Sequence, residues 1–225
     1  MKLALAFVTV LATVSQLDAS GIEVPASGTG ALAKDLQEFV NLLNVNKVVE
    51  LTKVYLANDK EFQWVISFMQ SDDMKDYLHD LADMPQFKKL LDYLMANGLD
   101  SYSLLEFIND AMNHKPKKIW SNSGLKISGG LSGYFSDLVA NTPVYGWTNL
   151  FEYKVATSIV FKNFVDEILS PQYTNLFTST FDNEHFANVL KQLQYLDIDS
   201  ETFHTNFSTL LVVKALIYQY ERILV

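Results

Sequence analysis

The chain of 225 residues contains no cysteine. Cysteine nucleophiles, thiol redox pairs and metal sites built on thiolates are therefore excluded. Disulfides are excluded as well, although secreted domains with small cores often depend on them. A chain of this length can bury a large core without such cross-links, so its stability should come from packing alone.

Positive charge is also scarce, with 17 lysines and arginines against 26 aspartates and glutamates, for a net charge of −9. The densest basic run, His114 to Lys118, is a single short stretch that we interpret as a solvated connector. An acidic chain of this kind is a poor ligand for nucleic acid, so we expect no nucleic-acid partner.

Long apolar runs are absent beyond the first residues. The nearest is Leu210–Tyr220, which is interrupted by Lys214 and falls well short of the ~20 residues that cross a bilayer. We expect a buried C-terminal helix there.

The start of the chain has a different composition. Lys2, the apolar run Leu3–Val14 and the small residue Ala19 are typical of a secretory signal peptide. The sequence therefore predicts a signal peptide over residues 1–19 and a secreted, extracellular protein that comprises residues 20–225. The alternative is an ordinary first helix of the fold.

The second half of the chain repeats the first at an offset of 99 residues, without a gap. Leu32 falls on Leu131, Phe62 on Phe161, and Asp100 on Asp199. The shared positions are mostly apolar, so the repeat preserves a shape and not a set of reactive groups. We infer a first unit over residues 31–114, a connector over 115–130 and a second unit over 131–225, all within one globular domain. The segment Ser20–Gly30, rich in small residues, is expected to be a flexible lead-in.

The apolar spacing within each unit is helical. Positions i, i+3, i+4 and i+7 are apolar from Phe62 to Met69, and again from Phe161 to Ile168. Capping residues and prolines recur at intervals that suggest about six short helices per unit, with starts or ends marked by Asp59, Pro85, Gly98, Asp100, Pro143 and Pro171. The sequence therefore predicts an all-α fold of about twelve short helices.

A short amphipathic helix cannot bury its apolar stripe alone, so the two units should close over one another about a pseudo-twofold axis. Periodicity does not decide whether the interior is solid or hollow. The 15 phenylalanines and 11 tyrosines can fill a core or line a pocket.

Several segments resemble one known family. Leu36–Leu43, Tyr55–Gln63, Leu90–Asp100 and Leu104–Ile108 are similar to the insect allergen-related repeat, found in cockroach group 1 allergens and mosquito midgut microvillar proteins. The second unit is more divergent, notably at Asn141–Pro143.

The resemblance implies two tandem six-helix repeats that close into one capsule around a large apolar cavity. It implies a lipid-binding protein, acting in the gut lumen or at the microvillar surface, whose ligands are fatty acids or phospholipid acyl chains. We expect a monomer without catalytic residues, metal or cofactor. The candidate lipid contacts are the repeated apolar positions: Phe39, Leu43, Leu51, Tyr55, Phe62, Val65, Ile66, Met69, Leu78, Phe87, Leu91, Leu94, Leu104, Ile108, Leu138, Leu150, Phe161, Phe164, Val165, Ile168, Phe177, Phe186, Leu190, Leu193, Phe203 and Phe207.

Recognisable catalytic patterns are scarce. No histidine belongs to an HExxH motif, and Ser132 lacks the glycine spacing of a nucleophile elbow. A cluster on one helical face could hold a hard metal, but a solvated acidic face is the simpler interpretation: Asp76, His79, Asp80 and Asp83.

Other functions remain open beside a lipid carrier. They are a membrane-active effector with transient membrane contact, a structural coat of the gut surface, and a nitrile-specifying detoxification enzyme, a role known for related repeats in butterflies. The tryptophans Trp64, Trp120 and Trp147 are either membrane-interface anchors or core and rim aromatics. Asn206 begins a glycosylation sequon.

Overall fold

The computed structural model describes residues 22–113 and 124–179, together with residues 184, 187, 188 and 191. These residues form α-helices and no β-strand, which confirms the all-α class. The named helices are α2 (Ala31–Asn41), α3 (Val45–Asn58), α4 (Lys60–Met69), α5 (Asp72–Asp83), α6 (Pro85–Ala96), α7 (Ser101–Asn113), α8 (Gly130–Ala140), α9 (Val144–Thr157), α10 (Ile159–Ile168) and α11 (Pro171–Ser179).

The helix boundaries follow the capping chemistry read from the sequence. The Asp59 carboxylate accepts a hydrogen bond from the Phe62 backbone N–H at 2.7 Å, which caps α4. Pro85 occupies the first turn of α6, where a missing N–H costs nothing. Gly98 follows the end of α6 with φ at 97°, a conformation that favours glycine.

The 99-residue offset reappears in the helices themselves. The starts and ends of α2, α3 and α4 recur in α8, α9 and α10, each displaced by 99 residues. The start of α11 is displaced from that of α5 by the same amount. The two halves therefore share helix lengths as well as apolar positions.

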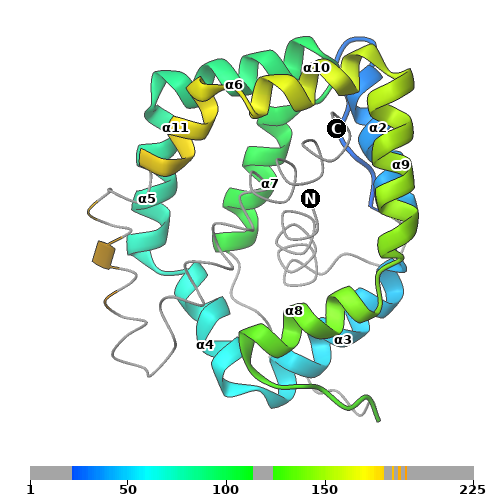
Figure 1. The fold of residues 1–225 in the computed structure, drawn as a ribbon. Coiled ribbons are helices and arrows are strands. Elements are labelled where there is room, and N and C mark those ends of the chain that lie inside the picture. The colour runs from blue at the N-terminus through cyan, green and yellow to red at the C-terminus, as the bar shows by residue number, and fades with distance from the viewer. Residues whose placement is uncertain (1–21, 114–123, 180–183, 185–186, 189–190, 192–225) are drawn as a thin grey trace.

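The two halves exchange their first helices. Helix α2 packs against α9 and α10, whereas α8 packs against α3 and α4. Thus the first helix of each unit lies on the second and third helices of the other. Figure 1 shows the two resulting pairs, α2 with α9 on the right and α3 with α8 below.

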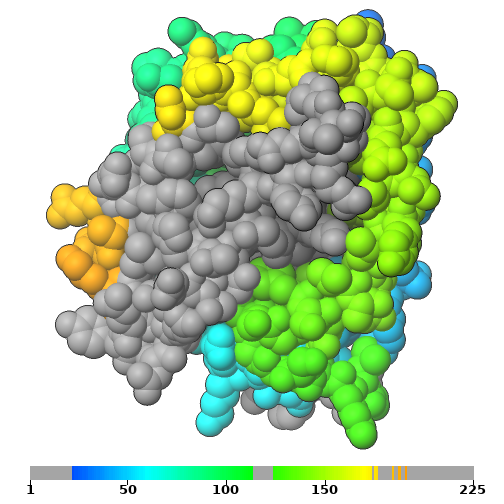
Figure 2. All heavy atoms as spheres, viewed as in Figure 1, coloured from blue at the N-terminus to red at the C-terminus, as the bar shows by residue number. Residues whose placement is uncertain are grey.

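Most of the described helices lie along a ring, with α7 inside its outline in the view of Figure 1. The main contacts join neighbours along it, from α3 through α4, α5, α6 and α11 to α10 and α9, and α7 packs against α6. In the space-filling view, α8, α9 and α10 form its lower, right-hand and upper margin (Figure 2).

The apolar core of the described residues is divided into three clusters. The first joins α3, α4, α5 and α7 to α8; the second joins α2, α9 and α10 with Leu99; and the third lies between α6 and α11. Domains of this size usually have one continuous core. In the described part of the chain the core is instead spread along the ring, with Leu94 and Ile168 packed against both the second and the third cluster.

The expectation of a flexible lead-in is wrong for the described residues 22–30. The Val24 backbone N–H donates to Gln37 Oε1 at 2.7 Å, and Gln37 Nε2 donates to the Ile22 carbonyl at 3.0 Å. Ala26 also pairs with Leu99 in an isolated antiparallel bridge. The small residues allow the segment to lie close against α2 and the turn after α6, where these partners hold it.

Candidate functional site

The structure distributes the candidate lipid contacts among the three clusters. In the first cluster, those buried are Leu51, Tyr55, Phe62, Val65, Ile66, Met69 and Leu138, with Leu78 and Ile108 partly buried against them. In the second, Phe39, Phe161 and Val165 are buried, and those partly buried are Leu94, Leu104, Leu150, Phe164 and Ile168. Phe87 is partly buried against the third, and Leu91 is 6% exposed.

Some predicted features lie outside the described residues. They are the signal peptide, Trp120, the sequon at Asn206, the side chain of Phe177, and the candidate contacts Phe186, Leu190, Leu193, Phe203 and Phe207.

Several of the most buried aromatic rings pack helix against helix at the two exchanged positions. Phe39 of α2 stacks on Phe161 of α10 with ring centroids 5.4 Å apart. On the other side, Phe62 of α4 lies 4.5 Å from Tyr134 of α8. These rings hold the exchanged helices in place, whereas the partly buried side chains retain accessible surface.

A buried ion pair fixes α2 on α9, and we name it the charged joint. Lys154 Nζ lies 2.7 Å from Asp35 Oδ1 and 2.6 Å from Glu38 Oε1. The Ser158 hydroxyl donates to the other oxygen of Asp35 at 2.6 Å. The side chains of Lys154 and Asp35 are only 8% and 12% exposed. Burial acts to lower the pKa of Lys154, but the hydrogen bonds and charges of the two carboxylates outweigh it and raise that pKa.

The equivalent contact between α3 and α8 carries no lysine, and we name it the neutral joint after its two uncharged tyrosines, beside which Asp137 carries a negative charge. At the 99-residue offset, Tyr55 replaces Lys154, Asp137 replaces Glu38, and Tyr134 replaces Asp35. Tyr55 donates to Asp137 Oδ2 at 2.6 Å, and the Tyr134 hydroxyl lies 2.8 Å from Thr52 Oγ1.

Both tyrosines of the neutral joint stay protonated over a wide pH range. Burial raises the pKa of Tyr55, and the hydrogen bond to Asp137 raises it further. Burial likewise raises the pKa of Tyr134. Burial also acts to raise the pKa of Asp137, but hydrogen bonds from Tyr55 and Ser128 outweigh it and leave that pKa below its ordinary value.

The N-terminal turn of α9 receives no acceptor from a side chain, although the Val144 N–H donates to the Thr142 carbonyl at 2.8 Å. Its N-cap residue is Pro143, which makes no side-chain capping hydrogen bond. At the equivalent start of α3, the Asn44 side chain accepts from the Lys47 N–H at 3.1 Å. Close to the uncapped end, Trp147 is 4% exposed, and its indole Nε1 is buried without a hydrogen-bond partner among the described residues.

An open groove of about 790 Å³ runs along α2 beside the lead-in. Its lining mixes apolar and polar side chains, including Val24, Val40, Lys34 and Gln37. Of the candidate lipid contacts, Leu43 alone lines this groove. The groove adjoins the second apolar cluster, because Val24 and Ala33 belong to both.

The acidic face predicted on residues 76–83 is exposed and partly paired. His79 Nδ1 lies 3.5 Å from Asp83 Oδ2, and Asp83 also accepts from Lys88 at 3.0 Å. Within residues 22–113 and 124–179, no group of three or more His, Asp or Glu side chains is placed to hold a metal ion. In the same part of the chain, no helix has the length and apolarity to cross a bilayer.

The sequence of the chain matches a known protein family. The family model described as "Insect allergen related repeat, nitrile-specifier detoxification" matches residues 31–203. The chain belongs to the insect allergen-related repeat family. The match covers both repeated units, which agrees with the recurrence of helix boundaries at the 99-residue offset.

A curated relative is also similar. The chain is 27% identical over 177 residues to "Protein G12" of the mosquito Anopheles gambiae, a match that covers 77% of this chain and 84% of the relative. The family resemblance read from the sequence is thereby confirmed.

The residues of the charged joint were missed by the sequence analysis, although a signal was present. Asp35 lies in an otherwise apolar stripe with Leu32 and Phe39, and Lys154 continues the stripe of Trp147 and Phe151. A charge at a buried helical position indicates a charged partner on another helix. Two such positions of opposite sign, one in each unit, pointed to contact between the units.

Proposed function

We propose that the chain is a secreted, monomeric lipid carrier that encloses fatty acids or phospholipid acyl chains inside the ring of helices. Membership of the family supports this proposal. The structural observation that carries it is the division of the apolar core into three clusters along the ring. Apolar clusters spread along a ring would offer inner surfaces to an apolar ligand, which a single continuous core would not.

The partly buried apolar side chains of the clusters are the proposed lining. They already contact the buried core on one side and retain some accessible surface. The set comprises Leu78, Phe87, Leu94, Leu104, Ile108, Leu150, Phe164 and Ile168. The fully buried rings of the same clusters have little surface left for a ligand.

The energetics suit a ligand that needs no directional chemistry. Burial of an acyl chain contributes about 0.8 kcal/mol per CH₂, so a sixteen-carbon chain gains on the order of 10 kcal/mol before the costs of association. Such binding tolerates different chain lengths. A repeat that preserves apolar positions and few reactive groups is consistent with this use.

Lipid extraction from purified protein tests the proposal. We expect mass spectrometry of an organic extract to show fatty acids or phospholipid, and the lipid-free protein to take up a fluorescent fatty acid. Phe164→Asp should reduce uptake, because it places a charge on the proposed lining. Ile159→Asp is the matched control. The Ile159 side chain is 67% exposed, so this substitution should leave fatty-acid uptake unchanged. A protein that carries no lipid and takes none up would refute the carrier function.

A second candidate, a membrane-active effector, is favoured by one observation. Three large apolar or aromatic side chains on α9 and at the start of α10 are well exposed: Tyr145 at 88%, Ile159 at 67% and Tyr153 at 59%. Aromatic side chains partition to the membrane–water interface. This role predicts dye release from liposomes at micromolar protein. If the liposomes stay intact, the membrane-active role is refuted and the carrier role is the remaining candidate.

A further inference from the structure

The buried indole N–H of Trp147 is the donor for which the described residues supply no acceptor. Trp147 is 4% exposed and lies on the buried stripe of α9, with its ring edge-on to Phe39 at a centroid distance of 6.4 Å. Buried tryptophan N–H groups nearly always have a partner, because an unmet donor loses its hydrogen bonds to water without replacement. Within residues 22–113 and 124–179, no acceptor is therefore supplied for this donor.

A second feature of the same turn also favours an acceptor that carries negative charge. The first N–H groups of a helix have no partner within the helix, and no side chain caps those of α9. The helix dipole makes this end partially positive, which favours an oxyanion. Side chains on a helix lean toward its N-terminus, so an indole at position 147 should be directed toward this uncapped turn.

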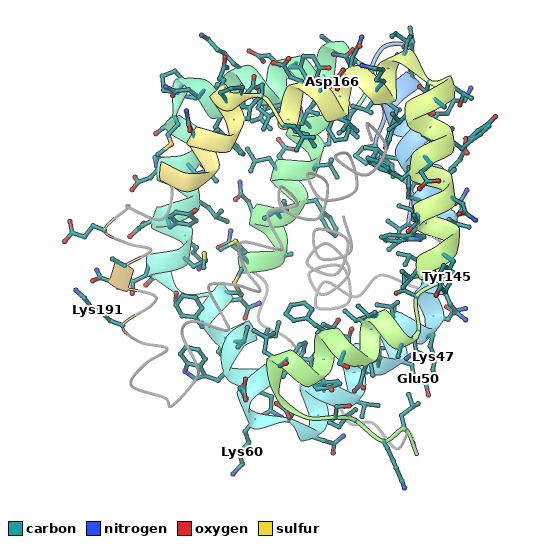
Figure 3. All side chains as sticks on the ribbon, in the orientation of Figure 1. Lys47, Glu50, Lys60, Tyr145, Asp166 and Lys191 are labelled. Carbon is teal, nitrogen blue, oxygen red and sulfur yellow. The ribbon has the colours of Figure 1, made fainter. Side chains whose placement is uncertain are left out.

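The N-terminal turn of α9 lies at the boundary between solvent and buried residues. Tyr145 is 88% exposed, yet Trp147, two residues later, is buried. Figure 3 shows Tyr145 where the chain passes from α8 into α9. A ligand held here would keep a polar head near solvent while its apolar part extends inward. That shape describes an amphiphile and not a neutral hydrocarbon.

We propose that the N-terminal turn of α9 and the Trp147 indole form a head-group site for a lipid oxyanion. The oxyanion is the carboxylate of a fatty acid or the phosphate of a phospholipid. Trp147 Nε1 and the uncapped backbone N–H groups of the turn donate to it, and the acyl chain continues into the ring. This inference rests on the proposed lipid-carrier function and adds the position and chemistry of the polar contact.

Removal of the indole N–H tests the site directly. Trp147→Phe keeps an aromatic ring, and we expect it to weaken palmitate binding about tenfold, as loss of a hydrogen bond to a charged group does. Hexadecane, which offers no acceptor, should compete equally well for a bound fluorescent fatty acid in both proteins. Trp64→Phe is the matched control, because Trp64 is partly buried against the first cluster and stacks on Phe68 at 5.4 Å.

A second variant addresses the backbone donors without touching the indole. Pro143→Asn restores the capping residue that the first unit has at Asn44. By analogy with Asn44 and Lys47, its side chain would accept from the Gly146 N–H, so palmitate binding should weaken while the helix becomes no less stable. Hexadecane competition should again stay unchanged.

Fluorescence quenching provides a readout that does not depend on altering the site. In the full-length Trp64→Phe/Trp120→Phe protein, Trp147 is the remaining tryptophan. Palmitate brominated at carbon 2 should quench it more strongly than palmitate brominated at carbon 16. Stronger quenching from carbon 16 would place the tail and not the head at this turn, and would overturn the proposal.

The outcomes separate the two levels of inference. Wild-type protein that binds neither palmitate nor hexadecane refutes the lipid carrier and the head-group site together. Wild-type protein that binds both, with Trp147→Phe weakening both equally or neither, refutes the head-group site and leaves the carrier function intact. Selective loss of palmitate binding supports the site.

Discussion

Replacement of Lys154 by methionine should destabilise the protein far more than an ordinary lysine substitution. Methionine keeps most of the apolar side chain but removes the charge that faces Asp35, whose side chain is 12% exposed. The Ser158 hydroxyl still donates to Asp35, so one hydrogen bond remains. Loss of one partner from a buried ion pair costs about 3–5 kcal/mol. Glu38, whose side chain is 51% exposed, should add no more than about 1 kcal/mol.

The neutral joint provides the matched control at the equivalent position of the other repeat. Tyr55→Phe removes one hydrogen bond to Asp137, which still accepts from the Ser128 N–H at 2.9 Å and from its hydroxyl at 2.7 Å. The expected loss is about 1–2 kcal/mol. Two substitutions related by the 99-residue offset should therefore differ by at least about 1 kcal/mol.

Urea denaturation followed by circular dichroism measures both values from the unfolding midpoint and slope. The double variant Asp35→Leu/Lys154→Met should regain most of the stability lost by Lys154→Met, because the charge that remains, Glu38, is 51% exposed and not buried. If Lys154→Met lowers the free energy of unfolding by less than about 1 kcal/mol, the pair behaves as a surface salt bridge. A double variant as unstable as the single would refute the assignment of the loss to the stranded Asp35 carboxylate.

Three further predictions follow from the packing and charge of single residues. Phe161→Ala should cost about 3–5 kcal/mol in urea denaturation, because Phe161 is 0% exposed and stacks on Phe39. Gly98→Ala should cost more than about 2 kcal/mol in thermal unfolding, because φ is 97° and the new Cβ would lie 2.5 Å from the α2 backbone. Gly28→Ala, at φ 51° in open space, should cost only about 1 kcal/mol in the same assay. Asp137 has a pKa below its ordinary value of 3.8. Its ionised form therefore stabilises the folded state above that value, and this stabilisation is lost as pH falls through the folded-state pKa. Asp137→Asn should flatten the dependence of stability on pH below about pH 4.

Much of the fold follows from features visible in the sequence. Residues that cap or end helices, such as Asp59, Pro85 and Gly98, fix boundaries through local chemistry that needs no knowledge of the tertiary structure. The offset of the repeat predicts equal helix lengths in both halves, and α2 to α4 and α8 to α10 have them. Helical spacing also identified Phe62 and Phe161 as buried.

The exchange of α2 and α8 could not be predicted in the same way. Apolar spacing shows which face of a helix is buried, but it does not show which helix covers that face. Asp35 and Lys154 each look unfavourable on an apolar stripe, and only their contact across the fold explains both. Likewise, Trp147 is an ordinary buried aromatic in the sequence, because the absence of an acceptor for its N–H depends on tertiary structure.

The crossed placement of α2 and α8 has a consequence for the history and assembly of the chain. A lone repeat would have no partner of its own for its opening helix, but two identical copies could trade these helices and form a homodimer. Fusion of the copies makes that association independent of concentration, yet contacts such as that between Asp35 and Lys154 span 119 residues of chain. Such distant closures slow folding, so the full chain should complete its native packing only after both repeats have been synthesised.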